Sequence, residues 1–250
     1  MGTAQPGAWS RRARPLLGTL VEVGIAAAGE DAATIDAAFA ALFEVQQCMS
    51  RFELGSDLSR FHALGYGQSL RVSPLTSDVL AAAAELQQAS GGAFDISQGS
   101  APQGWRYEGR TLHKLNRDVR LDLGGIAKGY AVDRAVQALM DRGCAAGWVN
   151  AGGDLRAFGE LALPVHLRDE DRGGVRLFAQ LQDGAFATSH FDVDTRSHLA
   201  AGPPASAGRK HVSVCAPRCL WADALTKIMA VRGDASDSLL ARYGATAWVH

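Results

Sequence analysis

Residues 121–133, LDLGGIAKGYAVD, place the Asp122 carboxylate, a pair of adjacent glycines and Lys128 at the start of an expected helix. Gly124 and Gly125 let the backbone approach a ligand without a Cβ atom in the way. The first turn of a helix offers backbone N–H groups and the positive end of the helix dipole, which suit a phosphate. Lys128 would add a mobile positive charge, and Asp122 places a carboxylate beside it. The segment therefore predicts a site for a phosphorylated, metal-bridged ligand.

The same residues also have a purely structural interpretation. A strand, a glycine turn and a helix commonly meet at a corner, and a lysine in the first helical turn is usually solvated. No Gly-Lys-Ser/Thr follows, so this is not a Walker motif, and the glycines are not spaced as in the dinucleotide fingerprint. The segment alone leaves both interpretations open.

Hydrophobic periodicity indicates which elements would position this segment. Helices are expected over 31–49, 76–90, 126–142, 221–231 and 236–243. Strands are expected over 19–26, 119–123, 147–150, 155–158, 165–167, 175–181, 184–188, 211–215 and 245–249. Residues 52–62 and 196–210 are expected to be irregular. Because strands and helices do not alternate strictly, the pattern favours an α+β fold over a doubly wound sheet.

Bulk composition restricts the function classes. The chain has 250 residues, is 47% hydrophobic and 20% charged, and carries a net charge of −1. This composition is typical of a globular protein, and the charge gives no long-range attraction for nucleic acid. The sequence contains no run of 18 or more apolar residues, so we expect no membrane-spanning segment. We expect one domain over residues 14–250, preceded by a flexible segment over residues 1–13.

Cysteines and the N-terminus bear on the cellular compartment. Cys48, Cys144, Cys215 and Cys219 form no dense framework, so we expect reduced thiols and no zinc site. The N-terminal residues contain three arginines but lack a cleavage site placed as in a secretory signal. These features predict a cytoplasmic protein.

Seven short motifs are spread along the chain in a recognisable order. They are RPLLGT at 14–19, MSRF at 49–52 with SDLSRFH at 56–62, GAFDIS at 92–97, residues 122–133, VNAGGDLR at 149–156, ATS at 187–189 and ADALT at 222–226. Each motif alone is weak, but the ordered set resembles the ApbE family of FAD:protein FMN transferases over residues 14–249. The resemblance implies an ApbE/T-fold-like arrangement of largely antiparallel sheets with packed helices.

The resemblance also implies a reaction. Enzymes of this family bind FAD and a divalent metal, usually Mg²⁺. They cleave the diphosphate, pass FMN to a threonine or serine hydroxyl of a partner protein, and release AMP. Some relatives instead hydrolyse FAD to FMN and AMP, and family members are often exported. The metal would neutralise phosphate charge as the P–O bond breaks.

Site residues are carried over from the resemblance by position. The FAD-contacting positions are Leu17, Phe52, Ala93, Phe94, Asp95, Asp122, Lys128 and His198. Phe94 could stack on the nucleotide, or simply pack in the core. Gly125 stands where the family offers a carbonyl oxygen to the metal, and Asp223 where it offers a carboxylate. Asp223 and Lys128 are the expected catalytic residues.

Several positions depart from the family pattern. Leu17 replaces a methionine, Phe52 replaces an aromatic hydroxyl, and His62 stands where asparagine is common. The loop after His198 lacks the usual aspartate and turn residues.

The sharpest departure follows Asp223. The family places a threonine four residues later to complete the metal shell, but this chain has Lys227 there and Thr226 one position earlier. In one interpretation, Thr226 supplies the oxygen and Lys227 points elsewhere or contacts a phosphate. In the other, the Lys227 ammonium pairs with Asp223 and takes the place of the metal. We favour the first, which makes Gly125, Asp223 and Thr226 the expected Mg²⁺ ligands.

Three activities follow from these residues. The leading hypothesis is Mg²⁺-dependent flavin transfer from FAD to a partner protein. The alternatives are an FAD-binding protein with little transferase activity, and an FAD pyrophosphatase with water as the acceptor. Lys227 and the altered loop favour the binding protein.

Overall fold

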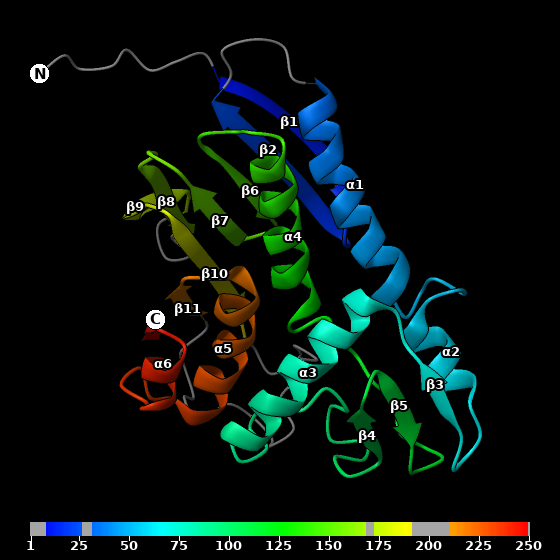
Figure 1. The fold of residues 1–250 in the computed structure, drawn as a ribbon. Coiled ribbons are helices and arrows are strands. Elements are labelled where there is room, and N and C mark those ends of the chain that lie inside the picture. The colour runs from blue at the N-terminus through cyan, green and yellow to red at the C-terminus, as the bar shows by residue number, and fades with distance from the viewer. Residues whose placement is uncertain (1–8, 27–31, 169–172, 192–210, 250) are drawn as a thin grey trace, which may run out of the picture.

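The computed structural model describes residues 9–26, 32–168, 173–191 and 211–249 (Figure 1). One large sheet carries helices on one face, and two smaller sheets are attached to this body. None of the helices in these ranges is long and apolar enough to cross a membrane.

The large sheet has seven strands, and every neighbouring pair is antiparallel. Its strands, in spatial order, are β1 (Trp9–Leu16), β2 (Thr19–Ala26), β6 (Gly147–Ala151), β7 (Asp154–Phe158), β10 (Gly184–His190), β11 (His211–Ala216) and β12 (Thr246–Val249). The long insertion between β2 and β6 contains most of the helices and one smaller sheet.

Three helices lie over one face of this sheet: α1 (Ala32–Met49), α4 (Ala127–Asp141) and α5 (Cys219–Arg232) (Figure 1). Apolar side chains at helical spacing explain the packing of α1 and α4, each of which turns a stripe of them toward the core, whereas α5 is buried on nearly all sides. The stripe of α1 includes Ile35, Phe39 and Leu42, which are all buried. A short helix, α6 (Leu239–Arg242), connects α5 to the last strand.

The insertion adds a second layer at one end of the molecule (Figure 1). It contains α2 (Asp57–Ala63), α3 (Pro74–Ala89) and a sheet of β3 (Ser69–Arg71), β5 (Thr111–Lys114) and β4 (Trp105–Glu108). A serine hydroxyl caps the N-terminus of each of these helices. Ser56 accepts from the amide of Ser59 at 3.0 Å, and Ser73 accepts from the amide of Thr76 at 3.2 Å. Side-chain caps of this kind satisfy amides that lack a partner within the helix.

A third sheet pairs β8 (Leu163–Arg168) with β9 (Val175–Leu181). It packs on the large sheet through a separate hydrophobic cluster that includes Phe178, Phe186 and Trp248. The rings of Phe178 and Trp248 meet edge to face with centroids 5.3 Å apart.

The α+β class with antiparallel sheets is confirmed, and several elements differ from the expectation. Residues 119–123 form no strand, because the amides of Leu121 and Asp122 donate to His62 Nε2 and the carbonyl of Ile96 instead of a ladder. Residues 52–62, expected to be irregular, contain most of α2. β1 begins at Trp9, ahead of the domain boundary expected at residue 14.

Candidate functional site

The site is built where α4 meets α5. Gly129 on α4 packs so closely that a Cβ atom there would lie 2.2 Å from the carbonyl oxygen of Cys219. This close approach lets the Gly129 amide donate to Oδ2 of Asp223 at 3.0 Å. Because residue 129 is glycine, α4 and α5 can approach closely enough for this bond to hold Asp223 in place.

Asp133, one turn further along α4, holds the start of α5. Its carboxylate accepts from the amides of Cys219 and Leu220 at 2.9 and 3.0 Å, and from Arg156 at 2.8 Å. A carboxylate at a helix N-terminus satisfies open amides and complements the helix dipole. Asp133 therefore caps α5 from a neighbouring helix, a role that the sequence motif did not reveal.

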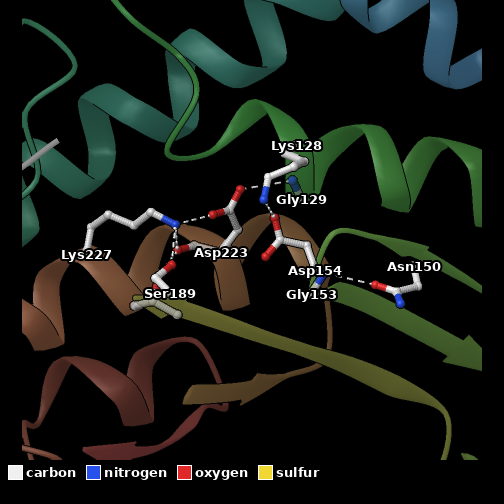
Figure 2. A network of polar contacts seen from close by, with 9 residues as sticks. Lys128, Gly129, Asn150, Gly153, Asp154, Ser189, Asp223 and Lys227 are labelled. Atoms are coloured by element: carbon white, nitrogen blue, oxygen red, sulfur yellow. Dashed lines mark hydrogen bonds and ion pairs between the residues drawn. The ribbon is translucent and has the colours of Figure 1, made fainter. Parts of the chain in front are cut away.

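Two lysines and two aspartates form a buried charge cluster at this junction (Figure 2). The ammonium of Lys128 lies 2.7 Å from Oδ2 of Asp154, which begins β7. The ammonium of Lys227 pairs with Oδ1 of Asp223. Asp223 is 0% exposed and Asp154 is 1% exposed, so both carboxylates depend on these partners.

The cluster shifts the pKa values of its members. Burial raises the pKa of Asp154 to about 6, and the charge of Asp223 adds to this, whereas Lys128 opposes it. Burial also acts to raise the pKa of Asp223, but Lys227 and Lys128 outweigh it and hold that pKa below its ordinary value. For Lys128, burial acts to lower the pKa, and the carboxylates of Asp154 and Asp223 raise it above the ordinary value. Asp223 is therefore charged at neutral pH.

The Lys227 side chain turns toward Asp223, which is the arrangement that we had not favoured from the sequence. Besides the carboxylate, its ammonium contacts the carbonyl oxygen of Asp223 at 3.0 Å and Oγ of Ser189 at 2.9 Å. The hydroxyl of Thr226 donates to the same carbonyl at 2.6 Å and lies 2.7 Å from the Ser189 hydroxyl. Lys227 and Thr226 thus both contact the carbonyl oxygen of Asp223 and the hydroxyl oxygen of Ser189.

Lys128 faces an open pocket of about 450 Å³ between α1, the start of α4 and the segment after α1. Of the eight predicted FAD-contacting residues, four line it: Leu17, Phe52, Asp122 and Lys128. A second pocket of about 430 Å³ shares Arg51, Phe52 and Asp122 with the first. The two pockets are therefore neighbours, and together they offer enough space for an extended ligand.

The wall between the pockets carries both charge and an aromatic face. Arg51 lies 3.3 Å from Oδ2 of Asp122 and 4.8 Å from the ring centre of Phe52. Phe52 is 80% exposed, so its ring is available to stack on a planar ligand. The sequence motif included Arg51, but we had not assigned it a role.

The predicted residues Ala93, Phe94 and Asp95 lie in the protein interior. Phe94 is 0% exposed, which agrees with the core-packing interpretation. The oxygens of Asp95 accept from the amide and hydroxyl of Ser97 at 2.8 and 2.7 Å and from the amide of Gly99 at 3.0 Å. Asp95 therefore braces the turn that lines the second pocket, and these bonds occupy both of its oxygens.

The remaining predicted site residues are placed as follows. Gly125 is buried in the turn before α4. His198 falls outside the described residues. Sequence reasoning placed Asp122 beside Lys128, but the ion-pair partner of Lys128 is Asp154. Asp154 follows a turn in which the Gly153 amide donates to Oδ1 of Asn150 at 3.0 Å (Figure 2).

Comparison with known proteins matches this chain to one family. The model of the ApbE family matches residues 17–248. The FAD:protein FMN transferase of Vibrio cholerae serotype O1 is 26% identical to this chain, and the match covers 77% of this chain and 71% of the relative.

Solved structures show the same fold. The flavin transferase ApbE of Vibrio cholerae gives a TM-score of 0.79 at 22% identity, covering 90% of this chain and 87% of that one. The apo flavinyl transferase ApbE of Pseudomonas stutzeri gives 0.80 at 20% identity, covering 99% and 92%. The ApbE protein of Thermotoga maritima gives 0.80 at 22%, covering 97% and 94%. The family model spans most of the chain, and this chain therefore belongs to the ApbE family.

Proposed function

We propose that this protein transfers FMN from FAD to a serine or threonine hydroxyl of a partner protein and releases AMP. Family membership and the name of the Vibrio cholerae relative support the reaction class. The observation that carries the proposal is that Phe52 and Lys128 line one pocket. An exposed aromatic ring suits a flavin or adenine ring, and an ammonium at a helix start suits a diphosphate.

The chemistry requires one bond to form and one to break. The acceptor hydroxyl oxygen attacks the phosphorus atom of the FMN half, and the bond from that phosphorus to the bridging oxygen breaks. AMP leaves with the bonding electrons, and the hydroxyl proton passes to a base or to water. Lys128, held by Asp154, would stabilise the negative charge that develops on the diphosphate oxygens.

Asp223 has a different role in this proposal from that of a general base. Both its carboxylate oxygens are engaged, one by the Gly129 amide and one by Lys227. It is also fully buried, so an acceptor hydroxyl does not reach it in this arrangement. We assign Asp223 to holding α4 against α5, which keeps Lys128 at the pocket.

The Mg²⁺ that the family resemblance implies does not fit the Asp223 oxygens as they stand. The ammonium of Lys227 contacts both the carboxylate and the carbonyl of that residue. The hydroxyl of Thr226 is donated to the same carbonyl. The proposed reaction therefore uses no metal at these residues.

The test is incubation of the purified protein with FAD and threonine-containing acceptor peptides. Mass spectrometry of the peptide and chromatography of the nucleotides give the products. Peptide-bound FMN with an equal amount of AMP supports the proposal. AMP with free FMN would instead show hydrolysis, and FAD bound without either product would show a binding protein; both outcomes contradict flavin transfer.

A further inference from the structure

Lys227 behaves as a cation that the chain itself supplies. Its ammonium has three N–H donors and three oxygen neighbours: Oδ1 and the carbonyl oxygen of Asp223, and Oγ of Ser189 (Figure 2). The residue is only 8% exposed. The three contacts satisfy the donors, so this lysine is fixed in place and does not extend into solvent.

The oxygens around Lys227 are of the type that a divalent cation would use. Mg²⁺ prefers carboxylate, carbonyl and hydroxyl or water oxygens at about 2.0–2.1 Å in octahedral geometry. Here the carboxylate and carbonyl of Asp223 and the hydroxyl of Ser189 already surround the ammonium. A metal bound to Oδ1 of Asp223 would lie against the ammonium, and the two positive charges would repel.

The other oxygens at this position are also committed. Oδ2 of Asp223 accepts from the Gly129 amide at 3.0 Å. The Thr226 hydroxyl donates its proton to the Asp223 carbonyl at 2.6 Å, so this carbonyl already accepts from both Thr226 and Lys227. A metal at these oxygens would therefore have to displace the Lys227 ammonium.

The charge balance of the cluster leads to the same result. Asp154 is paired with Lys128, and Asp223 is paired with Lys227, so two carboxylates already face two ammoniums. In the protein without FAD, adding a divalent cation would leave an excess of positive charge in a buried position. A neutral residue at position 227 would instead leave Asp223 short of one counter-charge, and a cation would be favoured there.

We infer that Lys227 is a built-in substitute for a divalent cation at Asp223, so that this protein binds no divalent metal there and needs none for its reaction. The second half of this inference rests on the proposed function. Lys227 is a positioning residue: it holds Asp223, which holds Gly129 and thereby the turn that presents Lys128 to the pocket. Lys128 is the ammonium that meets the diphosphate.

The binding test uses Mn²⁺ as a paramagnetic probe, followed by electron paramagnetic resonance. Wild-type protein and the variants Lys227→Thr, Lys227→Met and Lys227→Arg are titrated without FAD. FAD-loaded wild-type protein is then freed of unbound metal, and its manganese content is measured. The threonine variant removes the ammonium and supplies a hydroxyl, the methionine variant removes only the charge, and the arginine variant retains it.

We expect no Mn²⁺ binding by the wild type, with or without FAD, or by Lys227→Arg. Lys227→Thr should bind one Mn²⁺ with a Kd at least about tenfold below the highest Mn²⁺ concentration at which the wild type binds none, since changes beside a metal ligand typically alter affinity by roughly 10- to 100-fold. Lys227→Met should bind between the two. Stoichiometric Mn²⁺ on the wild type in either state would overturn the inference, and this measurement needs no variant to fold.

The activity test repeats the peptide assay with EDTA or with Mg²⁺. Wild-type transfer should proceed at the same rate in both, whereas Lys227→Thr should transfer FMN only with Mg²⁺. A purely structural lysine would not change the metal requirement. Wild-type transfer that stops in EDTA and returns with Mg²⁺ would overturn the inference. If the wild type forms no product in either condition, the proposed function fails, and the Mn²⁺ measurement still decides the cation site.

Discussion

The backbone amide of Gly129 donates to Oδ2 of Asp223 at 3.0 Å, although the two residues are 94 positions apart. This bond ties the first turn of α4 to the second turn of α5. It also links the two ion pairs of the site, because Lys128 precedes Gly129 and Lys227 pairs with Asp223. The charged groups therefore depend on a close approach of two helices, which glycine at residue 129 permits.

Gly129→Ala should destabilise the protein. The new Cβ would lie 2.2 Å from the Cys219 carbonyl oxygen and 2.8 Å from the Cβ of Asp223, and neither atom is the end of a flexible side chain that could move away. Overpacking of this kind costs about 1–3 kcal/mol, and the better helix propensity of alanine offsets at most about 1 kcal/mol. Urea unfolding should show a lower midpoint. Gly55→Ala is the control, because a Cβ there meets nothing within 4 Å, and equal losses in the two variants would contradict the explanation.

Lys128→Met should weaken FAD binding. Removal of a charged donor from a phosphate contact costs about 1.5–3 kcal/mol, which corresponds to roughly a 10- to 150-fold rise in Kd. Quenching of flavin fluorescence on titration with protein measures this Kd. Unchanged affinity would show that the diphosphate lies elsewhere.

The same substitution would leave Asp154 buried without its partner, so stability must be separated from binding. The double variant Lys128→Met/Asp154→Asn removes the unpaired carboxylate as well. We expect it to recover most of the unfolding free energy that the single variant loses, while FAD binding stays weak. Recovery of FAD binding in the double variant would contradict a direct role for the Lys128 charge.

Phe52 and Phe94 should respond in opposite ways to truncation. Phe52→Ala should leave the unfolding free energy almost unchanged, because the side chain is 80% exposed. It should weaken FAD binding by about 1 kcal/mol, roughly fivefold, through lost stacking, and Phe52→Tyr should retain the affinity. Phe94→Ala should lower stability by about 3–5 kcal/mol, as for a buried phenylalanine. Thermal unfolding and FAD titration of both variants distinguish these roles.

Periodicity and apolar runs predicted the long helices and most strands of the large sheet, because these elements bury many apolar side chains. It missed β1, whose residues 9–16 include three arginines and are mostly exposed at the sheet edge. It also assigned a strand to 119–123, where the apolar residues are buried but the amides bond to a side chain and an isolated carbonyl. The spacing of apolar residues indicates which side chains are buried. It does not indicate which hydrogen-bond acceptor each backbone amide uses.

The ordered motifs predicted the family and placed Lys128 and Phe52, which share a pocket. They did not predict the pairing within the site. Asp154, and not Asp122, is the partner of Lys128, because the strand order brings the turn before β7 beside α4. The orientation of the Lys227 side chain also could not be predicted from the sequence. The spacing of four residues allows a contact with Asp223, but the contact with Ser189 on β10 depends on how the chain folds.

His62 should make stability depend on pH. Its Nε2 accepts from the Leu121 amide at 2.9 Å, and burial together with the charge of Arg120 lowers the pKa of His62 below its ordinary value. The folded protein then binds fewer protons than the unfolded chain near pH 6, so this contribution to stability is present above the unfolded pKa of about 6.5 and is lost as pH falls. The slope from this one group is at most about 1.4 kcal/mol per pH unit.

His62→Asn removes the titrating group and retains an oxygen that can accept from the Leu121 amide. Urea unfolding of both proteins at a series of pH values from 8 to 5 measures the difference in unfolding free energy. We expect this difference to be constant at the alkaline end and to shift in favour of the asparagine variant as the solution becomes acidic, because only the wild type must protonate Nε2 and break the bond. Parallel curves over the whole range would show that His62 does not control the acid loss of stability.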